Sequence, residues 1–106
     1  MNEELRKKIE GLINSHKVFL FLKGTPEEPQ CGFSWKVVET LKGLGVKFGS
    51  FDILSDEEMR QAVKEYSDWP TYPQLYVSGK LIGGCDLVLE MAESGELKKL
   101  IEGIVD

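Results

Sequence analysis

One short segment, residues 18–22, constrains the fold of this chain more than any other part of its sequence. All five of its residues are apolar, in the order Val, Phe, Leu, Phe, Leu. A strand without polar positions is typical of a sheet that is covered on both faces. We therefore expect helices on both sides of a central sheet.

Helical spacing of apolar residues occurs on both sides of this strand. Residues 3–14 carry apolar side chains every three or four positions and predict a first helix. A loop with two prolines, residues 23–30, follows the strand. A second helix is expected from near Gly32 to the glycines at positions 43 and 45, and a second strand over residues 46–53.

The next part of the chain predicts a third helix and a hairpin. Ser55, followed three residues later by Glu58, forms a capping box that marks the start of the third helix. Two short apolar segments, residues 74–77 and 80–82, flank Ser78-Gly79. This arrangement predicts a tight β-hairpin.

The C-terminal part shows a helical pattern from Asp86 to the end, interrupted near Ser94-Gly95. Its last apolar stripe consists of Leu97, Leu100, Ile101 and Ile104. The resulting order of elements is α-β-α-β-α-β-β-α-α. Strands separated by helices and followed by a hairpin predict an α/β fold, with a mixed sheet flanked by helices. We expect a single domain over residues 1–106.

Composition and charge argue against several classes of protein. The net charge is −5 and the sequence has no basic block, which argues against a nucleic-acid surface. The longest unbroken apolar run is five residues, far too short for a membrane-spanning helix. Two cysteines do not make a disulfide scaffold, and a thiol-dependent site suits a reducing compartment. The first residues lack an apolar signal core, so we predict no targeting segment.

Cys31 is the main candidate for chemistry, because it stands between the proline-containing loop and the second helix. A thiol at a helix N-terminus faces unpaired N–H groups and the positive end of the helix dipole, which favour the thiolate. Lys23 would add positive charge, although a solvated lysine is common in such loops. Ser34 stands where a dithiol redox protein has its second cysteine, so Cys31 is predicted to be a nucleophile or metal ligand without a local disulfide. The alternative is a small buried apolar residue.

Other reactive arrangements are not predicted. The single histidine, His16, precedes the first strand, so no Ser-His-Asp triad is expected. Two cysteines and one histidine cannot complete a tetrahedral zinc site within one chain.

Two further segments are candidates to border a site. Residues 69–73 form either an ordinary turn, with a trans Tyr72-Pro73 bond, or a backbone left free to pair with an extended ligand. Residues 83–86 place two glycines before Asp86, which permit close backbone approach, whereas the simpler role of Asp86 is a helix N-cap. Arg60 has a similar alternative, an ion pair with Asp56 four residues earlier.

Four motifs occur in order along the chain: Lys23-Gly24-Thr25-Pro26, Cys31-Gly32-Phe33-Ser34, Trp69-Pro70-Thr71-Tyr72-Pro73-Gln74 and Gly83-Gly84-Cys85-Asp86. Together they resemble the monothiol glutaredoxins of the Cys-Gly-Phe-Ser class, over essentially the whole chain. The sequence is most similar to glutaredoxin modules of multidomain, PICOT-like proteins, so we expect an excised module or a single-domain relative. The resemblance implies a thioredoxin fold of the glutaredoxin type, with a four-stranded mixed sheet and a cis Tyr72-Pro73 bond.

The resemblance also implies a groove for glutathione. Lys23 and Arg60 would bind its glycine carboxylate. The segment Thr71-Tyr72-Pro73 would contact its cysteinyl unit, with the Tyr72 backbone pairing as a strand does. Gly84, the backbone of Cys85 and the Asp86 carboxylate would hold its γ-glutamyl end. Cys31 would then lie beside the glutathione sulfur.

Two mechanisms for Cys31 follow from this resemblance, and a third reading needs no thiol chemistry. In the leading mechanism, two copies and two glutathiones give four thiolates to one [2Fe-2S] cluster. The protein would be a monomer as apo protein and a homodimer with the cluster, acting in iron–sulfur assembly, transfer and iron homeostasis. In the second, Cys31 removes glutathione from mixed disulfides, as a weak oxidoreductase at most. The third is an interaction module that docks a recipient or BolA-like protein. The expected compartment is the cytoplasm, with the nucleus as an alternative.

Trp35 departs from the family pattern, in which many relatives have a smaller or more polar residue after the serine. An exposed indole would favour dimerisation or shield a cluster from water, whereas a packed indole would do neither. Cys85 matches many members of the family but not all, and we give its thiol no catalytic part.

Overall fold

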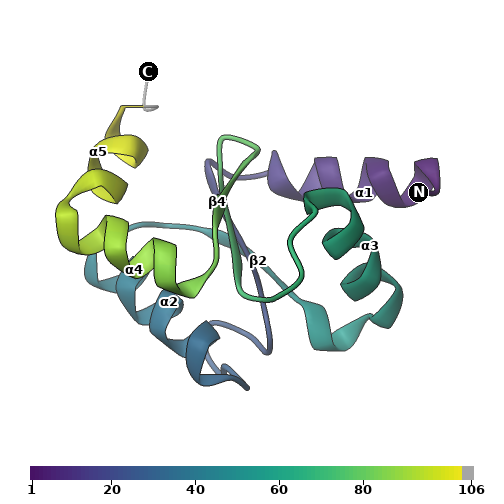
Figure 1. The fold of residues 1–106 in the computed structure, drawn as a ribbon, viewed down its shortest axis with the longest axis horizontal. Coiled ribbons are helices and arrows are strands. Elements are labelled where there is room, and N and C mark those ends of the chain that lie inside the picture. Colours follow the sequence, from purple (N-terminus) through teal and green to yellow (C-terminus); the bar gives the residue numbers. More distant parts are fainter. Residues whose placement is uncertain (104–106) are drawn as a thin grey trace.

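A four-stranded mixed sheet, in the order β2-β1-β3-β4, forms the centre of residues 1–103, the part of the chain that the computed structural model describes (Figure 1). The strands are β1 (Val18–Leu22), β2 (Gly49–Asp52), β3 (Gln74–Val77) and β4 (Lys80–Gly83). The helices are α1 (Glu3–Ile13), α2 (Gly32–Gly43), α3 (Glu57–Ser67), α4 (Cys85–Ser94) and α5 (Glu96–Glu102), and a 3-10 turn, η1 (Ile53–Ser55), precedes α3. This order confirms the predicted succession of elements.

The central strand β1 pairs in parallel with β2 and antiparallel with β3. All of its residues are buried, as its apolar sequence predicts. Successive side chains of a strand point to opposite faces of the sheet. Phe19 and Phe21 therefore face one layer of helices, while Val18, Leu20 and Leu22 face the other.

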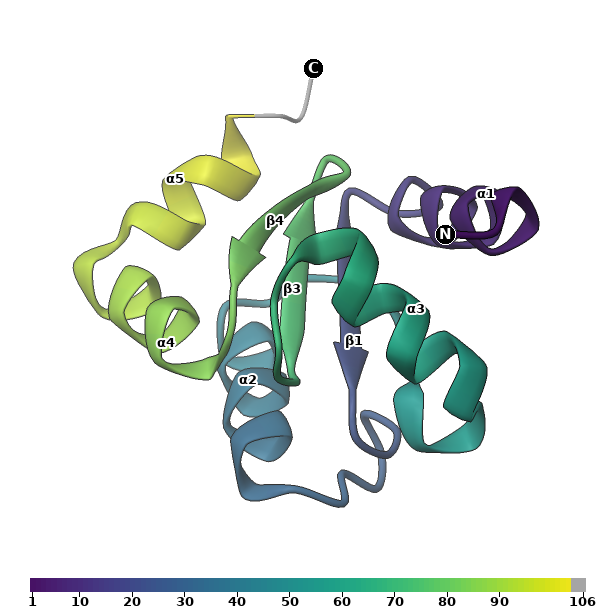
Figure 2. The ribbon, with the colours of Figure 1, turned by 45° about the vertical axis from the view of Figure 1, so that its right-hand side comes forward.

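Helices cover both faces of the sheet (Figure 2), and a hydrophobic core lies between the sheet and each layer of helices. The aliphatic core packs β1 and β3 against α2, α4 and α5, and includes Leu41 and Leu97. The aromatic core packs the same strands against α1 and α3. In it, the rings of Phe21 and Tyr76 meet edge to face, with 5.7 Å between their centroids. Burial of both sets of side chains supplies the main driving force for folding.

The second strand is shorter than predicted. It begins at Gly49 rather than at residue 46. The N–H group of Val46 still donates to the Leu41 carbonyl, at 3.1 Å, so residues 46–48 complete the exit from α2. Val46 and Phe48 pack against the aliphatic core from this connection. Their apolar character therefore reflects burial rather than pairing in the sheet.

The predicted cap of α3 is also wrong by one residue. Ser55 lies in η1, where its hydroxyl donates to the Asp52 carbonyl at 2.7 Å. Asp56 caps α3 instead, and its carboxylate accepts from the Met59 N–H at 3.1 Å. The competing turn therefore decides which of two adjacent capping residues is used.

The hairpin is confirmed, and the C-terminal stripe is confirmed in part. Ser78 and Gly79 have φ values of 51° and 77°, as a two-residue turn of the mirror-image type requires. Leu97 is buried, whereas Leu100 is exposed and not part of the apolar stripe. Ile101 packs against the aliphatic core. Ile104 lies outside the described residues.

Candidate functional site

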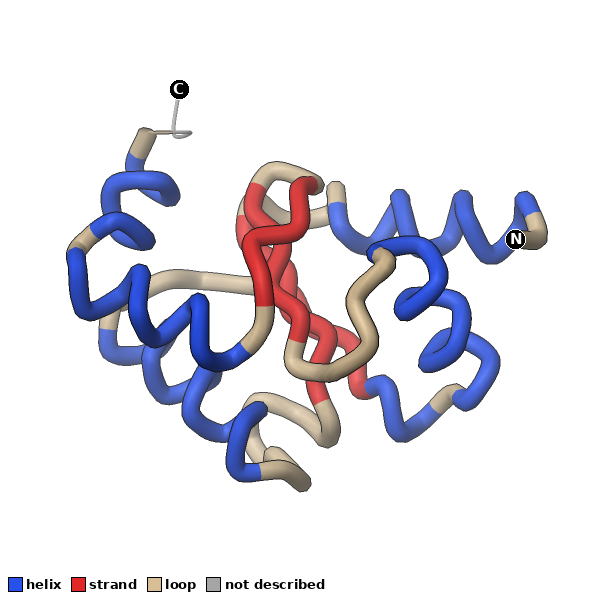
Figure 3. The backbone as a smooth tube through the Cα atoms, in the orientation of Figure 1, coloured by secondary structure: helices blue, strands red, loops and turns tan. Residues whose placement is uncertain are grey.

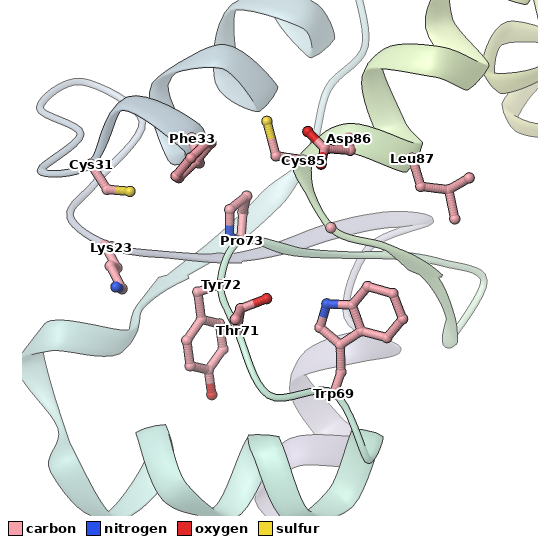
Figure 4. A pocket seen from close by; sticks show the side chains of 11 residues that line it. Lys23, Cys31, Phe33, Trp69, Thr71, Tyr72, Pro73, Cys85, Asp86 and Leu87 are labelled. Atoms are coloured by element: carbon pink, nitrogen blue, oxygen red, sulfur yellow. The ribbon is translucent and has the colours of Figure 1, made fainter.

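A cavity of about 580 Å³ opens at the ends of β1 and β3, between the first turns of α2 and α4 (Figure 4). Four segments line it. They are Lys23 after β1, Cys31 and Phe33 at the start of α2, Trp69 and Thr71 to Pro73 before β3, and Gly84 to Leu87 at the start of α4. In the close-up, Cys31 and Lys23 lie on one side, Asp86 and Leu87 on the other, and Tyr72-Pro73 between them.

Cys31 is the N-cap residue of α2, and its side chain makes no capping hydrogen bond. The residue is half-buried. Partial burial raises the pKa of its thiol, but the N–H groups of Ser34 and Phe33, the Lys23 ammonium and the Ser34 hydroxyl together lower that pKa below its usual value. The helix start therefore stabilises a thiolate that remains accessible from the cavity, as predicted.

Ser34 links the start of α2 to the end of β1. It is completely buried, and its hydroxyl accepts from the Lys23 N–H at 3.1 Å. The Lys23 carbonyl accepts from the Gln30 N–H at 2.9 Å, which closes the loop between strand and helix. A buried serine with this partner does not act as a nucleophile, but it fixes the backbone that carries Lys23 beside Cys31.

Asp52 holds the other side of the same loop. One of its carboxylate oxygens accepts from the N–H groups of Gly24 and Leu54, each at 2.9 Å. Gly24 has a φ of +96°, and a Cβ there would lie 2.6 Å from the Glu28 carbonyl oxygen. Only glycine fits this crossing of two backbone segments.

The side chain of Gln74 fixes the segment that precedes β3. This side chain is completely buried, and its amide nitrogen donates to the carbonyls of Trp69 and Thr71 at 3.2 and 3.3 Å. Its amide oxygen accepts from the Tyr76 hydroxyl at 3.1 Å. Every group of the amide thus has a partner, which keeps the segment in one conformation.

Tyr72 turns its ring away from Cys31, toward α3 (Figure 4). Its hydroxyl donates to the Arg60 carbonyl at 2.7 Å, and burial raises its pKa above the usual tyrosine value. The Tyr72-Pro73 bond is cis, as the resemblance implies, and not trans. Because the side chain is committed elsewhere, Tyr72 can offer only its backbone to a molecule in the cavity.

The start of α4 forms the opposite wall. The N-cap residue is Gly84, without a side-chain capping bond, so the alternative role of Asp86 as the N-cap is wrong. A Cβ on Gly84 would lie 3.3 Å from both the Pro73 carbonyl oxygen and the Trp69 indole nitrogen. The two walls approach closely here because the residue is glycine.

Cys85 and Asp86, the first residues of α4, differ sharply in environment. Cys85 is buried, and burial together with the neighbouring Asp86 raises the pKa of its thiol. Asp86 is exposed at the mouth of the cavity. The helix start therefore presents an inert thiol, free N–H groups and an accessible carboxylate.

Most of the residues predicted from the sequence meet in this cavity, but Arg60 does not line it. Its guanidinium Nη1 lies 4.0 Å from Glu57, while its Nε is buried without a hydrogen-bond partner. The alternative pairing of Arg60 with Asp56 is wrong, because Asp56 caps α3 and lies 3.7 Å from Lys8.

Three lining residues have no predicted role of their own: Phe33, Trp69 and Leu87, although the segment 69–73 as a whole is predicted to border a site. Phe33 and Trp69 stand inside the quoted motifs, so the motif positions themselves were the available signal. Leu87 follows Asp86 in the first turn of α4, and only its exposure beside the cavity reveals it. His16 is not part of the site. It lies before β1, where its ring nitrogen is 2.9 Å from the Ser15 hydroxyl.

Residues 1–103 contain neither a preformed metal site nor a membrane-spanning helix. No group of three or more His, Cys, Asp or Glu side chains in this range is placed to hold a metal ion. None of the described helices combines the length and the apolar character needed to cross a membrane.

The chain is similar to known proteins over nearly its whole length. A family model described as glutaredoxin matches residues 18–82. Monothiol glutaredoxin-S11 of rice is 60% identical over 94% of this chain, which spans only 20% of that protein. An uncharacterized monothiol glutaredoxin (ycf64-like) of Synechocystis is 48% identical over 96% of this chain and 95% of its own length.

Solved structures agree with the sequence relatives. The solution structure of reduced poplar apo GrxS14 has a TM-score of 0.82 and 50% identity, covering 93% of this chain and 91% of that one. A buckwheat glutaredoxin–glutathione complex has a TM-score of 0.83 and 25% identity, covering 97% and 94%. The thioredoxin-type fold is thereby confirmed, and the chain belongs to the glutaredoxin family, among its monothiol members.

Proposed function

We propose that this chain binds glutathione in the cavity beside Cys31, and that two copies with two glutathiones hold one [2Fe-2S] cluster for transfer to other proteins. The observation that carries this function is the accessible Cys31 thiol, which has a lowered pKa and faces a cavity with charged and backbone groups on its other walls. The cluster is cargo that the protein receives and passes on.

The walls of the cavity suit the chemistry of glutathione, which carries two carboxylates, one ammonium group and one thiol. Lys23 offers a cation beside Cys31, where it would attract the glycine carboxylate. The uncapped start of α4 offers N–H groups to the γ-glutamyl carboxylate, and Asp86 offers a counter-charge to its ammonium. The Tyr72 backbone lies between these ends and would pair with the cysteinyl unit. Because Arg60 does not line the cavity, its guanidinium would approach the glycine carboxylate of glutathione from beyond the cavity wall.

The donor set of the chain fits a shared cluster. A [2Fe-2S] cluster takes four thiolates. Cys31 supplies one, whereas burial and a raised pKa keep the Cys85 thiol from supplying a second. Ser34 cannot replace a thiolate. Two copies of Cys31 and two glutathione thiols complete the set, and the two external thiols make the cluster exchangeable.

Anaerobic reconstitution with iron, sulfide and glutathione tests this function. The unmodified protein should become coloured, with visible absorption of a [2Fe-2S] cluster, and should sediment as a dimer. Cys31→Ser and reconstitution without glutathione should both give a colourless monomer. Cys85→Ala, which keeps the backbone of α4, should retain the colour. A colourless monomer from the unmodified protein would contradict the function.

A second candidate function is removal of glutathione from mixed disulfides, favoured by the same lowered thiol pKa. The Cys31 thiolate attacks the glutathione sulfur, the substrate leaves as a thiolate, and Cys31 is left in a disulfide with glutathione. The thiolate of a second glutathione then attacks that sulfur, which releases oxidised glutathione and restores Cys31. Robust turnover of a glutathionylated peptide would rank this function first, and slow turnover is expected.

The relatives support a proposal for the setting of the domain. We infer that residues 1–106 are one glutaredoxin domain, either a module of a longer PICOT-like protein or a single-domain relative. A cytoplasmic location, with the nucleus as the alternative, suits a site that depends on a reduced thiol. Iron–sulfur recipients and BolA-like proteins are the expected partners. Co-purification with the tagged full-length protein, compared with its Cys31→Ser variant, tests which partners depend on the cluster.

A further inference from the structure

Exposed aromatic side chains are concentrated at the start of α2. Phe33 is 56% exposed and Trp35 is 53% exposed, more than any other large apolar side chain among residues 1–103. Both stand in the first turns of the helix that begins at Cys31. Leu87, which is 40% exposed, lies across the cavity at the start of α4. An apolar rim of this kind around a reactive thiol marks a surface that another molecule covers.

Trp35 stands beside the cavity rather than within it. Its N–H donates to the Cys31 carbonyl at 2.9 Å, so it lies one helical turn after the thiol. Side chains of a helix lean toward its N-terminus, which brings the indole over the turn that starts at Cys31. Trp35 does not line the cavity, whereas Phe33 does. A ligand that fills the cavity therefore leaves the indole uncovered.

We propose that Trp35 is a contact surface for a second copy of this chain when two copies share a cluster. This inference rests on the proposed function, because one accessible thiolate per chain is what brings two helix starts together. The Cys31 residues of two copies then meet about a twofold axis, and the indole of each copy covers the rim of the other. Apolar cover at this place also keeps water from the ligating sulfurs.

The size of the surface explains why a second copy would bind only with the cluster. A fully buried aromatic side chain covers about 150–250 Å². One half-exposed indole per copy therefore gives a total of roughly 200 Å² for two copies, well below the approximately 1,200 Å² typical of a stable interface. The net charge of −5 on each copy adds repulsion. The indole strengthens a dimer that the cluster nucleates, but it does not form one alone.

Trp35→Gln tests this surface in the chain reconstituted with iron, sulfide and glutathione. The dissociation constant of the coloured dimer, measured by sedimentation equilibrium, should rise at least tenfold, as for loss of a buried aromatic anchor. The visible spectrum per cluster and the glutathione affinity of the apo protein should not change. Trp35→Phe should restore most of the affinity between copies.

Leu100→Gln is the matched control. Leu100 is 38% exposed on α5, which lies far from the start of α2 (Figures 1 and 2). This variant should leave the dissociation constant of the dimer unchanged. If a coloured dimer forms and Trp35→Gln dissociates no more readily than the unmodified protein, the contact surface is overturned while the proposed function stands. If no coloured dimer forms from the unmodified protein, both are overturned.

Binding of a different protein at the indole, in place of a second copy, is the alternative outcome of the Trp35→Gln experiment. If the cluster-loaded dimer is unaffected by Trp35→Gln but binding of a BolA-like protein is lost, the indole contacts that partner. The second copy is then the wrong occupant of the surface. Circular dichroism and thermal unfolding of the apo variants confirm that each variant is folded, which an exposed position permits.

Discussion

Helices cover both faces of the sheet (Figure 3), and the helices of the two faces begin in different ways. On the aromatic face, α1 is capped by Asn2, which accepts from two backbone N–H groups, and α3 is capped by Asp56. On the aliphatic face, α2 and α4 begin at Cys31 and Gly84, and neither start has a side-chain capping bond. Both of these starts border the cavity.

This difference separates helix starts that are stabilised by a cap from helix starts whose N–H groups are available for binding. A side-chain cap satisfies N–H groups and stabilises its helix by about 1 kcal/mol. An uncapped start forgoes that stabilisation but leaves N–H groups and a positive partial charge available for an anion. The chain therefore caps α1 and α3 with side chains and leaves α2 and α4 open toward the cavity, while α5, which does not line the cavity, follows α4 after Gly95 and has no side-chain cap either.

The two thiols provide the largest expected contrast between the helix starts that border the cavity. The pKa of Cys31 is lowered and that of Cys85 is raised, so at pH 7 the thiolate fraction is larger at Cys31. Burial protects Cys85 further, and we expect iodoacetamide to modify Cys31 at least about 100-fold faster in the folded protein. As the pH is raised, modification of Cys31 should accelerate at a lower pH than modification of Cys85. Peptide mass spectrometry can follow both rates. Equal rates before denaturation would contradict the assigned environments.

Gln74 connects the aromatic core to the cavity wall, and its substitution tests whether the cavity depends on this connection. Its amide oxygen accepts from the Tyr76 hydroxyl in the aromatic core, while its amide nitrogen donates to the carbonyls of Trp69 and Thr71. Gln74→Leu leaves these groups without partners and should lower the free energy of unfolding by about 2 kcal/mol. It should also weaken glutathione binding by displacing the backbone of residues 69–73.

Urea denaturation and calorimetric titration with glutathione measure the two effects of Gln74→Leu. Gln61→Leu is the control, because Gln61 is exposed on α3 and bonds only Glu57, at 3.0 Å. It should change stability by no more than about 0.5 kcal/mol. Unchanged glutathione affinity in a folded Gln74→Leu protein would show that the loop does not depend on this amide.

Asp56, before the first turn of α3, and Asp86, in the first turn of α4, give the smallest expected effects. The two effects are opposite, because one substitution should change stability and the other glutathione affinity. Asp56→Ala removes the cap of α3 and should lower the free energy of unfolding by about 1 kcal/mol without changing glutathione affinity. Asp86→Ala removes an exposed carboxylate that caps nothing, so stability should change by no more than about 0.5 kcal/mol.

The same Asp86→Ala variant should weaken glutathione binding about tenfold, the effect of one lost charge-assisted contact. Thermal unfolding and calorimetric titration, applied to both variants, separate stability from affinity. Reversed effects, with Asp86 needed for stability and Asp56 for glutathione, would break the division between capped and open helix starts.

Much of the fold and of the candidate site follows from local patterns. The run Val18–Leu22 predicted a strand buried on both faces, and the hairpin turn and helices occur where periodicity places them. The cap of α3 could not be chosen, because Ser55 and Asp56 are both good caps and the turn at η1 decides between them. Gln74 gave no signal of its role, since a polar residue at the start of a strand is normally exposed.

By itself, the sequence determined the order of elements, the two-sided cover of β1 and the position of Cys31 at a helix start, because these depend on periodicity over neighbouring residues. Only the tertiary structure decided which residues share a cavity. It brought Leu87 to the wall, left Arg60 outside it, and distinguished the accessible Cys31 from the buried Cys85. The burial that separates the two thiols depends on elements far apart in the chain, so only the packing of those elements around the cavity could set it.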